Sequence, residues 1–201
     1  MITLSSPGSV ASEAYRTLRT NLLYPSGNNR PTVIVVSSPG TREGKSTVCA
    51  NLAVALAQAE KDVLLVDGVL REPMLHKFFT LENTHGLVSV LIGRFGIEDA
   101  WYEPMPKLKV LTAGPEPDES ADLLDSERFA AFMRQVRARF DYVLVDAPPV
   151  GLVSDTAILA AHSDGVLLVV DANKTPKNSV RQSVRSLEAV GVEVLGTVMS
   201  D

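Results

Sequence analysis

Short segments made almost entirely of apolar residues recur along this chain, and segments with helical periodicity separate them. The expected strands are residues 32–38, 62–67, 108–114, 141–149, 164–171 and 192–199, and the expected helices are residues 9–23, 46–59, 85–93, 126–139 and 176–189. A strand that is apolar on both sides must be covered on both sides, which is typical of parallel sheets. The pattern therefore predicts an α/β fold in which helices flank a mostly parallel sheet on both faces.

The chain length of 201 residues suits one large domain. We therefore expect residues 1–201 to form a single domain, with helix 9–23 as an N-terminal appendage and residues 25–31 as a connector rich in turn-forming residues.

The segment "SSPGTREGKST", residues 37–47, follows an expected strand and leads into an expected helix. The usual phosphate-binding pattern is G-x-x-x-x-G-K-[ST], and here Pro39 stands in the place of the first glycine. A loop in this context directs backbone N–H groups and a helix N-terminus at an anion. We predict a P-loop NTPase that binds ATP or ADP, although a chance glycine turn is the alternative. The candidate nucleotide-binding residues are Gly40, Thr41, Arg42, Glu43, Gly44, Lys45, Ser46 and Thr47.

Specific roles follow from the pattern. Lys45 is placed to reach the β- and γ-phosphates, the Ser46 hydroxyl to ligate Mg²⁺, and Thr47 to contact the α-phosphate. Arg42 adds a cation near the phosphates, hinders their approach or points into solvent, and the sequence leaves these alternatives open.

Two further expected strands end in an acidic residue, Asp67 and Asp146. In open parallel sheets ligands bind outside the carboxyl ends of the strands, so both side chains should lie near the phosphate loop. An acid after four apolar residues is the arrangement that holds Mg²⁺ in many ATPases, and the alternative is that each acid caps a turn. Asp171 also ends a strand but lacks the flanking pattern, so we expect it to be a cap. Arg71 is expected either to pair with an acid or to contact phosphate.

Composition narrows the function further. The formal net charge is −5, which does not favour a nucleic-acid partner. The single cysteine, Cys49, rules out a disulfide within the chain and is expected to be a small core residue. With no apolar stretch of about 18 residues, the sequence predicts a cytoplasmic protein rather than one that crosses the membrane.

Taken together, the motifs resemble those of the cytoplasmic domain of the bacterial tyrosine kinases (BY-kinases), P-loop ATPases of capsule and exopolysaccharide systems. The phosphate loop resembles the family's "S-x-P-G-x-G-E-G-K-S-T", residues 64–79 ("LLVDGVLREPMLHKFF") resemble "LLVDGDLRKPxxHxxF", and residues 140–150 ("FDYVLVDAPPV") resemble "YDYVIIDTPPV". The family's helical E-x-x-R-x-x-R-T-N-L motif is matched by Glu13, Arg16, Arg19, Thr20, Asn21 and Leu22.

The resemblance implies a protein-tyrosine kinase that uses ATP and Mg²⁺. Lys45, Asp67 and Asp146 would be catalytic, and Ser46, Asp67 and Asp146 would organise the metal, with an aspartate activating the tyrosine hydroxyl.

The resemblance also implies partners. Glu13, Arg16 and Arg19 would join subunits into a homo-oligomeric ring, a tyrosine-rich C-terminal tail would be the substrate, and a membrane protein of the polysaccharide co-polymerase type would be the activator. The chain would then lie in the cytoplasm at the inner face of the cell membrane, held through a partner or a membrane segment outside this sequence.

Two departures from the family matter. Val69 replaces the second aspartate of "D-G-D-L-R", and the sequence stops at Asp201 after a strand without a tyrosine cluster, so a tail either lies beyond it or does not exist. One alternative function is therefore a nucleotide-binding assembly module with little kinase activity. Another is an ATPase of the partition and cell-division type, although those relatives carry a signature lysine where this loop has Gly40.

Overall fold

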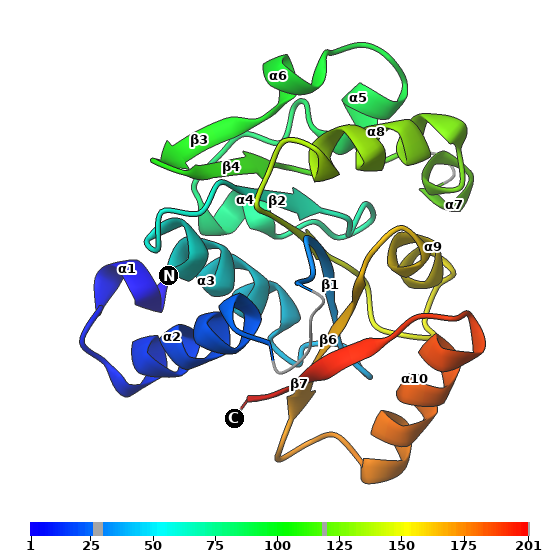
Figure 1. Cartoon of the computed structure of the whole chain (residues 1–201). Coiled ribbons are helices and arrows are strands. Elements are labelled where there is room, and N and C mark those ends of the chain that lie inside the picture. Colours follow the sequence, from blue (N-terminus) through cyan, green and yellow to red (C-terminus); the bar gives the residue numbers. More distant parts are fainter. Residues whose placement is uncertain (26–29, 118–119, 201) are drawn as a thin grey trace.

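The computed structural model describes residues 1–25, 30–117 and 120–200. Within them, seven strands form one sheet with the order β3-β4-β2-β5-β1-β6-β7 (Figure 1). Every neighbouring pair is parallel except β3 and β4 at one edge. The strands are β1 (Val33–Ser37), β2 (Val63–Asp67), β3 (Tyr102–Met105), β4 (Leu108–Leu111), β5 (Tyr142–Asp146), β6 (Gly165–Asp171) and β7 (Val194–Ser200). The predicted mostly parallel sheet is confirmed.

Helices cover both faces of this sheet, as predicted (Figure 1). Alternate residues of β1 show why: Val33 and Val35 belong to one hydrophobic core, and Ile34 and Val36 belong to the other. The first core includes side chains of α5 (Leu87–Leu91), α6 (Ile97–Ala100), α7 (Ser120–Leu124), α8 (Glu127–Arg137), α9 (Asp155–Ala161) and α10 (Lys177–Ala189). The second is closed by α2 (Val10–Leu23), α3 (Lys45–Ala57) and α4 (Leu75–Phe78), and a short α1 (Ile2–Ser5) contacts α2 and α3. Because successive side chains of a strand point to opposite faces, each buried strand contributes to two apolar layers, one on each side of the sheet.

Several elements were not expected from the sequence. Strand β3 contains Pro104, which cannot donate a backbone hydrogen bond, and it lies at the sheet edge where this loss is tolerated. Helix α9 has seven residues and follows a loop with two prolines. The short helices α1, α4, α6 and α7 also went unpredicted. Residues 26–29 of the expected connector lie outside the described residues.

The helix ends follow local chemistry. Helix α2 begins after Ser9, whose hydroxyl oxygen accepts a hydrogen bond from the Ser12 N–H, and α8 begins after Ser126 in the same way. Pro176 precedes α10 as its N-cap, one position earlier than its expected place inside the helix.

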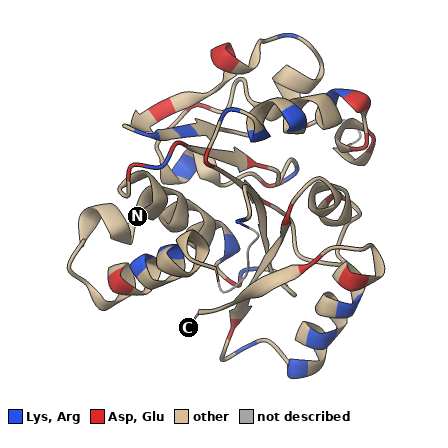
Figure 2. Ribbon diagram, viewed as in Figure 1, with Lys and Arg blue, Asp and Glu red and all other residues tan. Residues whose placement is uncertain are grey.

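Lys, Arg, Asp and Glu are spread over helices, strands and loops (Figure 2). On α10, Lys177, Arg181 and Arg185 are exposed at four-residue spacing. None of the helices in the described ranges is both long and apolar enough to cross a membrane.

Candidate nucleotide-binding site

The loop between β1 and α3 has the backbone shape of an anion cradle. Arg42 and Gly44 adopt left-handed conformations, with φ of 58° and 83°, and Gly44 is the N-cap of α3. A side chain at position 44 would be strained by this φ, which explains the glycine. Successive N–H groups in such a turn, followed by a helix N-terminus, favour a bound phosphate.

Glu43 is held from the neighbouring strand ends and fixes the loop. Its carboxylate accepts a hydrogen bond from the Asp171 N–H at 3.4 Å, and its backbone carbonyl accepts one from the Ser200 hydroxyl at 2.9 Å. Because C=O and N–H point in opposite directions across a trans peptide, a carbonyl held by Ser200 turns the Gly44 N–H the other way. Glu43 is buried and its carboxylate is occupied by Asp171, so only its backbone is left for the predicted contact with nucleotide.

Asp67 and Asp146 lie side by side at the carboxyl edge of the sheet. They are direct neighbours in the register of β2 and β5, and Asp146 is also paired with Val36 at the end of β1. Strand β5 lies between β2 and β1, so Asp146 is the aspartate nearer to the phosphate loop. Both carboxylates are completely buried.

The two carboxylates differ in their hydrogen bonds. Asp67 accepts bonds from the backbone N–H groups of Val69, Met74 and Leu75 at 3.2, 3.1 and 3.0 Å, and so it fixes the segment that leads into α4. Both oxygens of Asp146 are buried without a hydrogen-bond partner in the part of the chain that the structure describes. A buried carboxylate in this condition costs free energy unless a cation compensates it.

The pKa values follow from these surroundings. Burial, and then the charge of Asp146, raise the pKa of Asp67 to about 7 although its backbone hydrogen bonds lower it. Burial raises the pKa of Asp146 to about 6, opposed by the Lys45 ammonium and the nearby Ser46 hydroxyl. Two adjacent buried carboxylates with raised pKa values form a site where a cation can replace a proton.

A pocket of about 980 Å³ lies next to this pair: Val69 and Pro148, each two residues beyond an aspartate, line it, whereas Asp67 and Asp146 are not among its lining residues. Its walls come from the phosphate loop, from the segment between β2 and α4, and from the segment between β5 and α9. Seven of the eight predicted nucleotide-binding residues line it, and Gly40 is not among the lining residues: Thr41, Arg42, Glu43, Gly44, Lys45, Ser46 and Thr47. The Lys45 Nζ lies 3.4 Å from the Ser46 Oγ, so the predicted phosphate and metal contacts occupy one corner. Val69 and Arg71 belong to the facing wall.

Other sequence predictions have clear outcomes. Asp171 is a cap, as expected: its carboxylate accepts hydrogen bonds from the N–H groups of Asn173 and Lys174 and forms an ion pair with the Lys174 side chain. The Lys174 ammonium is the main reason that the pKa of Asp171 lies below its usual value. Cys49 is a fully buried core residue, as expected.

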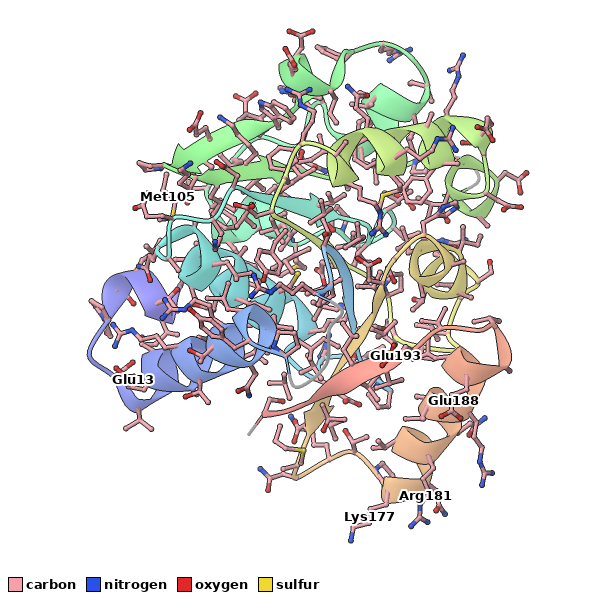
Figure 3. All side chains as sticks on the ribbon, in the orientation of Figure 1. Glu13, Met105, Lys177, Arg181, Glu188 and Glu193 are labelled. Atoms are coloured by element: carbon pink, nitrogen blue, oxygen red, sulfur yellow. The ribbon has the colours of Figure 1, made fainter. Side chains whose placement is uncertain are left out.

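The expected oligomerisation residues make contacts within the chain. Glu13 and Arg16 form an ion pair one turn apart on α2, and Arg19 donates a hydrogen bond to the Ala55 carbonyl of α3 at 3.2 Å. Figure 3 shows Glu13 on the outer side of α2, away from Lys177 and Arg181 on α10. The walls of the pocket are built by other segments, so these three side chains lie outside it.

Sequence reasoning missed three residues next to the pocket: Ser120, Asp155 and Ser200. Asp155 lines the pocket and binds Ser120, and Ser200 binds Glu43. Their partners are 35 and 157 residues away in the sequence, so no local motif signals them. The only local sign is the position of Ser200 at the carboxyl end of a strand.

The residues fit Mg²⁺ with a phosphate ligand rather than a metal held by protein alone. Among the described residues no group of three or more His, Cys, Asp or Glu gathers into a metal site. Mg²⁺ commonly uses one or two protein carboxylates and completes its shell with water and phosphate oxygens. The unbonded oxygens of Asp146 beside Ser46 supply that limited set.

Comparisons with known proteins agree with this geometry. Residues 32–194 match the family model AAA_31, described as an AAA domain. The Tyrosine-protein kinase YwqD of Bacillus subtilis is 39% identical over 201 residues, which cover 100% of this chain and 85% of that protein.

Solved structures show the same relationship. The chimerical protein CapA2B2 matches with a TM-score of 0.94 and 34% identity over 98% of this chain and 88% of that one. The kinase domain of Escherichia coli tyrosine kinase ETK matches with a TM-score of 0.94 and 28% identity over 99% of this chain and 78% of that one.

A more distant match is the septum site-determining protein MinD of Pyrococcus horikoshii, which was solved with Mg-ADP. Its TM-score is 0.72 and its identity 25%, over 84% of this chain and 69% of that one. The P-loop neighbours thus include one that holds nucleotide and Mg²⁺, whereas the tyrosine kinase domains fit this fold more closely and over more of its length. The chain therefore belongs to the bacterial tyrosine kinases, a family of P-loop ATPases.

Proposed function

We propose that this chain is an ATP-dependent protein-tyrosine kinase domain of a capsule or exopolysaccharide synthesis and export system. The observation that carries the proposal is the buried, unbonded carboxylate of Asp146 beside Lys45 and Ser46, two residues that line a pocket large enough for a nucleotide. Family membership supports the identity of the phosphate acceptor.

Each residue has a role in this mechanism. The backbone N–H groups of the loop and of the start of α3 bind the phosphates, and Lys45 contacts the β- and γ-phosphates. Ser46, Asp146 and Asp67 are the residues that would hold Mg²⁺, which when bound neutralises charge on the phosphates. Because metal ligands must be deprotonated, the raised pKa values make metal binding weaken as the pH falls below about 7.

The acceptor step needs a base. A tyrosine hydroxyl attacks the γ-phosphorus, its proton passes to an aspartate carboxylate, and the bond between the β,γ-bridging oxygen and the γ-phosphorus breaks to release ADP. A pKa near the operating pH suits a proton acceptor, and in the metal-free chain Asp67 has a pKa of about 7. We assign the role of proton acceptor to Asp67. The adjacent Asp146 is the carboxylate on the metal side of the pair.

Assembly is part of the proposal. Glu13, Arg16 and Arg19 on α2 would form the contact between subunits of a ring, and a membrane protein of the polysaccharide co-polymerase type would activate the domain at the inner face of the membrane. The CapA2B2 match and the kinases among the relatives support this assembly. A tyrosine-rich tail, on this chain or on a neighbouring subunit, would be the substrate.

The test is transfer of labelled phosphate. The chain is incubated with γ-labelled ATP, Mg²⁺ and a tyrosine-rich peptide, and phosphotyrosine is measured beside a Lys45→Met control. The expected result is labelled phosphotyrosine that depends on Mg²⁺ and on Lys45. Nucleotide binding without any phosphotyrosine would contradict the kinase and favour the alternative of an assembly module, which the comparisons do not favour.

A further inference from the structure

A chain of hydrogen bonds runs from the pocket wall into the core, opposite the phosphate loop. The Arg71 Nε donates to the Ser120 Oγ at 3.3 Å, and the Ser120 hydroxyl donates to the Asp155 Oδ2 at 2.9 Å. Ser120 and Asp155 are 2% and 1% exposed, whereas Arg71 is exposed. Arg71 and Asp155 line the same pocket as the phosphate loop.

The direction of these bonds is fixed by chemistry. The Nε–H of arginine can only donate, and an ionised carboxylate can only accept, so the serine hydroxyl must accept from Arg71 and donate to Asp155. Nε is thereby fixed, while the terminal nitrogens of the guanidinium make no hydrogen bond to the residues that the structure describes. The two terminal nitrogens of the anchored guanidinium, unbonded to the described residues, can therefore donate to phosphate oxygens, whose geometry they match.

The arrangement is a poor one for stability alone. The Asp155 Oδ1 is buried and has no partner within the described ranges. A direct, two-bond contact between arginine and aspartate would satisfy both groups better. Ser120 instead stands between them, so the guanidinium stays at the pocket surface and not against Asp155.

We propose that Ser120 and Asp155 are positioning residues that hold Arg71 at the pocket, where its guanidinium binds the terminal phosphate of a nucleoside triphosphate. This inference rests on the proposed function. The phosphate loop and Lys45 hold the phosphates from one wall, and Arg71 adds a cation from the facing wall. Such an arginine discriminates the triphosphate from the diphosphate, because only the triphosphate has a terminal group that extends beyond the loop.

The experiment compares binding of Mg-ADP with binding of a non-hydrolysable ATP analogue by calorimetry. Wild type is expected to prefer the ATP analogue, and Ser120→Ala is expected to lower that preference about tenfold while the Kd for ADP changes less than twofold. Arg71→Lys should lose the preference for the ATP analogue although it keeps the charge, because lysine has no guanidinium group that can bind Ser120 through Nε and phosphate through its terminal nitrogens. Asp155→Asn keeps an acceptor for the Ser120 hydroxyl and should retain most of the preference that Asp155→Leu loses.

A matched control is Ser163→Ala, which removes a hydroxyl that donates to the Ala160 carbonyl outside the pocket. The control should leave the preference unchanged. The inference is overturned if Ser120→Ala weakens both nucleotides equally, or if it changes only the melting temperature. It is also overturned if the wild type binds both nucleotides equally well. If the wild type binds neither nucleotide, the proposed function fails and the inference fails with it.

Discussion

Replacing Asp146 with asparagine should stabilise the nucleotide-free chain while removing its response to Mg²⁺. The amide has nearly the same shape as the carboxylate but carries no charge. In the structure that charge is fully buried and has no hydrogen-bond partner within the described residues. The variant therefore removes a cost of folding together with a ligand of the proposed metal site.

The magnitude follows from the pKa. Burial raises the pKa of Asp146 from 3.8 to about 6, a difference of about 2 units, and each unit corresponds to about 1.4 kcal/mol. The folded chain therefore binds this proton more tightly than the unfolded chain. Stability falls as the pH rises from about 4 to about 6, and the full cost of about 3 kcal/mol is present above that range. Removing the charge also relieves Asp67, whose pKa the Asp146 charge raises.

Urea unfolding at two pH values checks this reasoning. At pH 8, Asp146→Asn should raise the free energy of unfolding by about 3 kcal/mol. At pH 5 the gain should fall to about half, about 1.5 kcal/mol, because Asp146 is then mostly protonated in the folded wild type but ionised in the unfolded chain. Thermal unfolding with Mg-ADP should show a Mg²⁺-dependent stabilisation in wild type that the variant lacks.

Asp171→Asn is the matched control, because Asp171 also ends a strand but has its pKa lowered, mainly by its hydrogen bond to Lys174. For a lowered pKa the sign reverses: the ionised form is favoured in the folded state, so this variant should lose stability at pH 8. A stabilisation by Asp146→Asn that is equal at pH 5 and pH 8, or no stabilisation at pH 8, would refute the argument.

Three further predictions test the site and the fold. Ser200→Ala, by releasing the carbonyl of the phosphate loop, should weaken Mg-ADP binding about fivefold in calorimetry, as expected for one hydrogen bond of about 1 kcal/mol, whereas Thr197→Ala on the same strand should not. Val69→Asp should raise Mg²⁺-dependent phosphate transfer, because it returns a carboxylate to the pocket wall, and an unchanged or lower rate would count against that role. Gly86→Ala should lower the free energy of unfolding by about 3 kcal/mol in urea, because its Cβ would lie 2.2 Å from the Thr112 carbonyl oxygen; an unchanged value would contradict this close approach of the two backbones.

The sequence alone was enough to predict the parallel sheet and the loop at its edge, because both depend on local patterns. An apolar run such as 62–67 predicts a strand that is buried on both faces, whichever segments cover it. The Gly44-Lys45-Ser46 sequence predicts the start of a helix after the strand, because glycine can adopt the left-handed conformation at the N-cap. Strand β3 escaped prediction because Pro104 interrupts its pattern, and α9 escaped because seven residues give too little periodicity.

Contacts between distant segments lay beyond reach of sequence reasoning. Asp67 was predicted to bind metal, yet its oxygens also fix the N–H groups of Met74 and Leu75, a bond pattern that depends on how the following segment folds back. The link from Arg71 through Ser120 to Asp155 joins three segments that are far apart in the sequence, and Ser120 meets Asp155 because α7 and α9 pack together.

Pro148 explains why the Asp146 carboxylate lacks one of the backbone donors that Asp67 has. Asp67 accepts a hydrogen bond from the N–H two residues ahead, at Val69, but the same position after Asp146 is Pro148, which has no N–H. The Pro148 carbonyl is in turn held by the hydroxyls of Ser37 and Thr156, so this backbone cannot turn to offer another group. The folded chain therefore keeps a buried carboxylate whose negative charge lowers the free energy of unfolding. A cation that binds at Asp146 removes this cost, and the free energy regained contributes to the affinity for the cation.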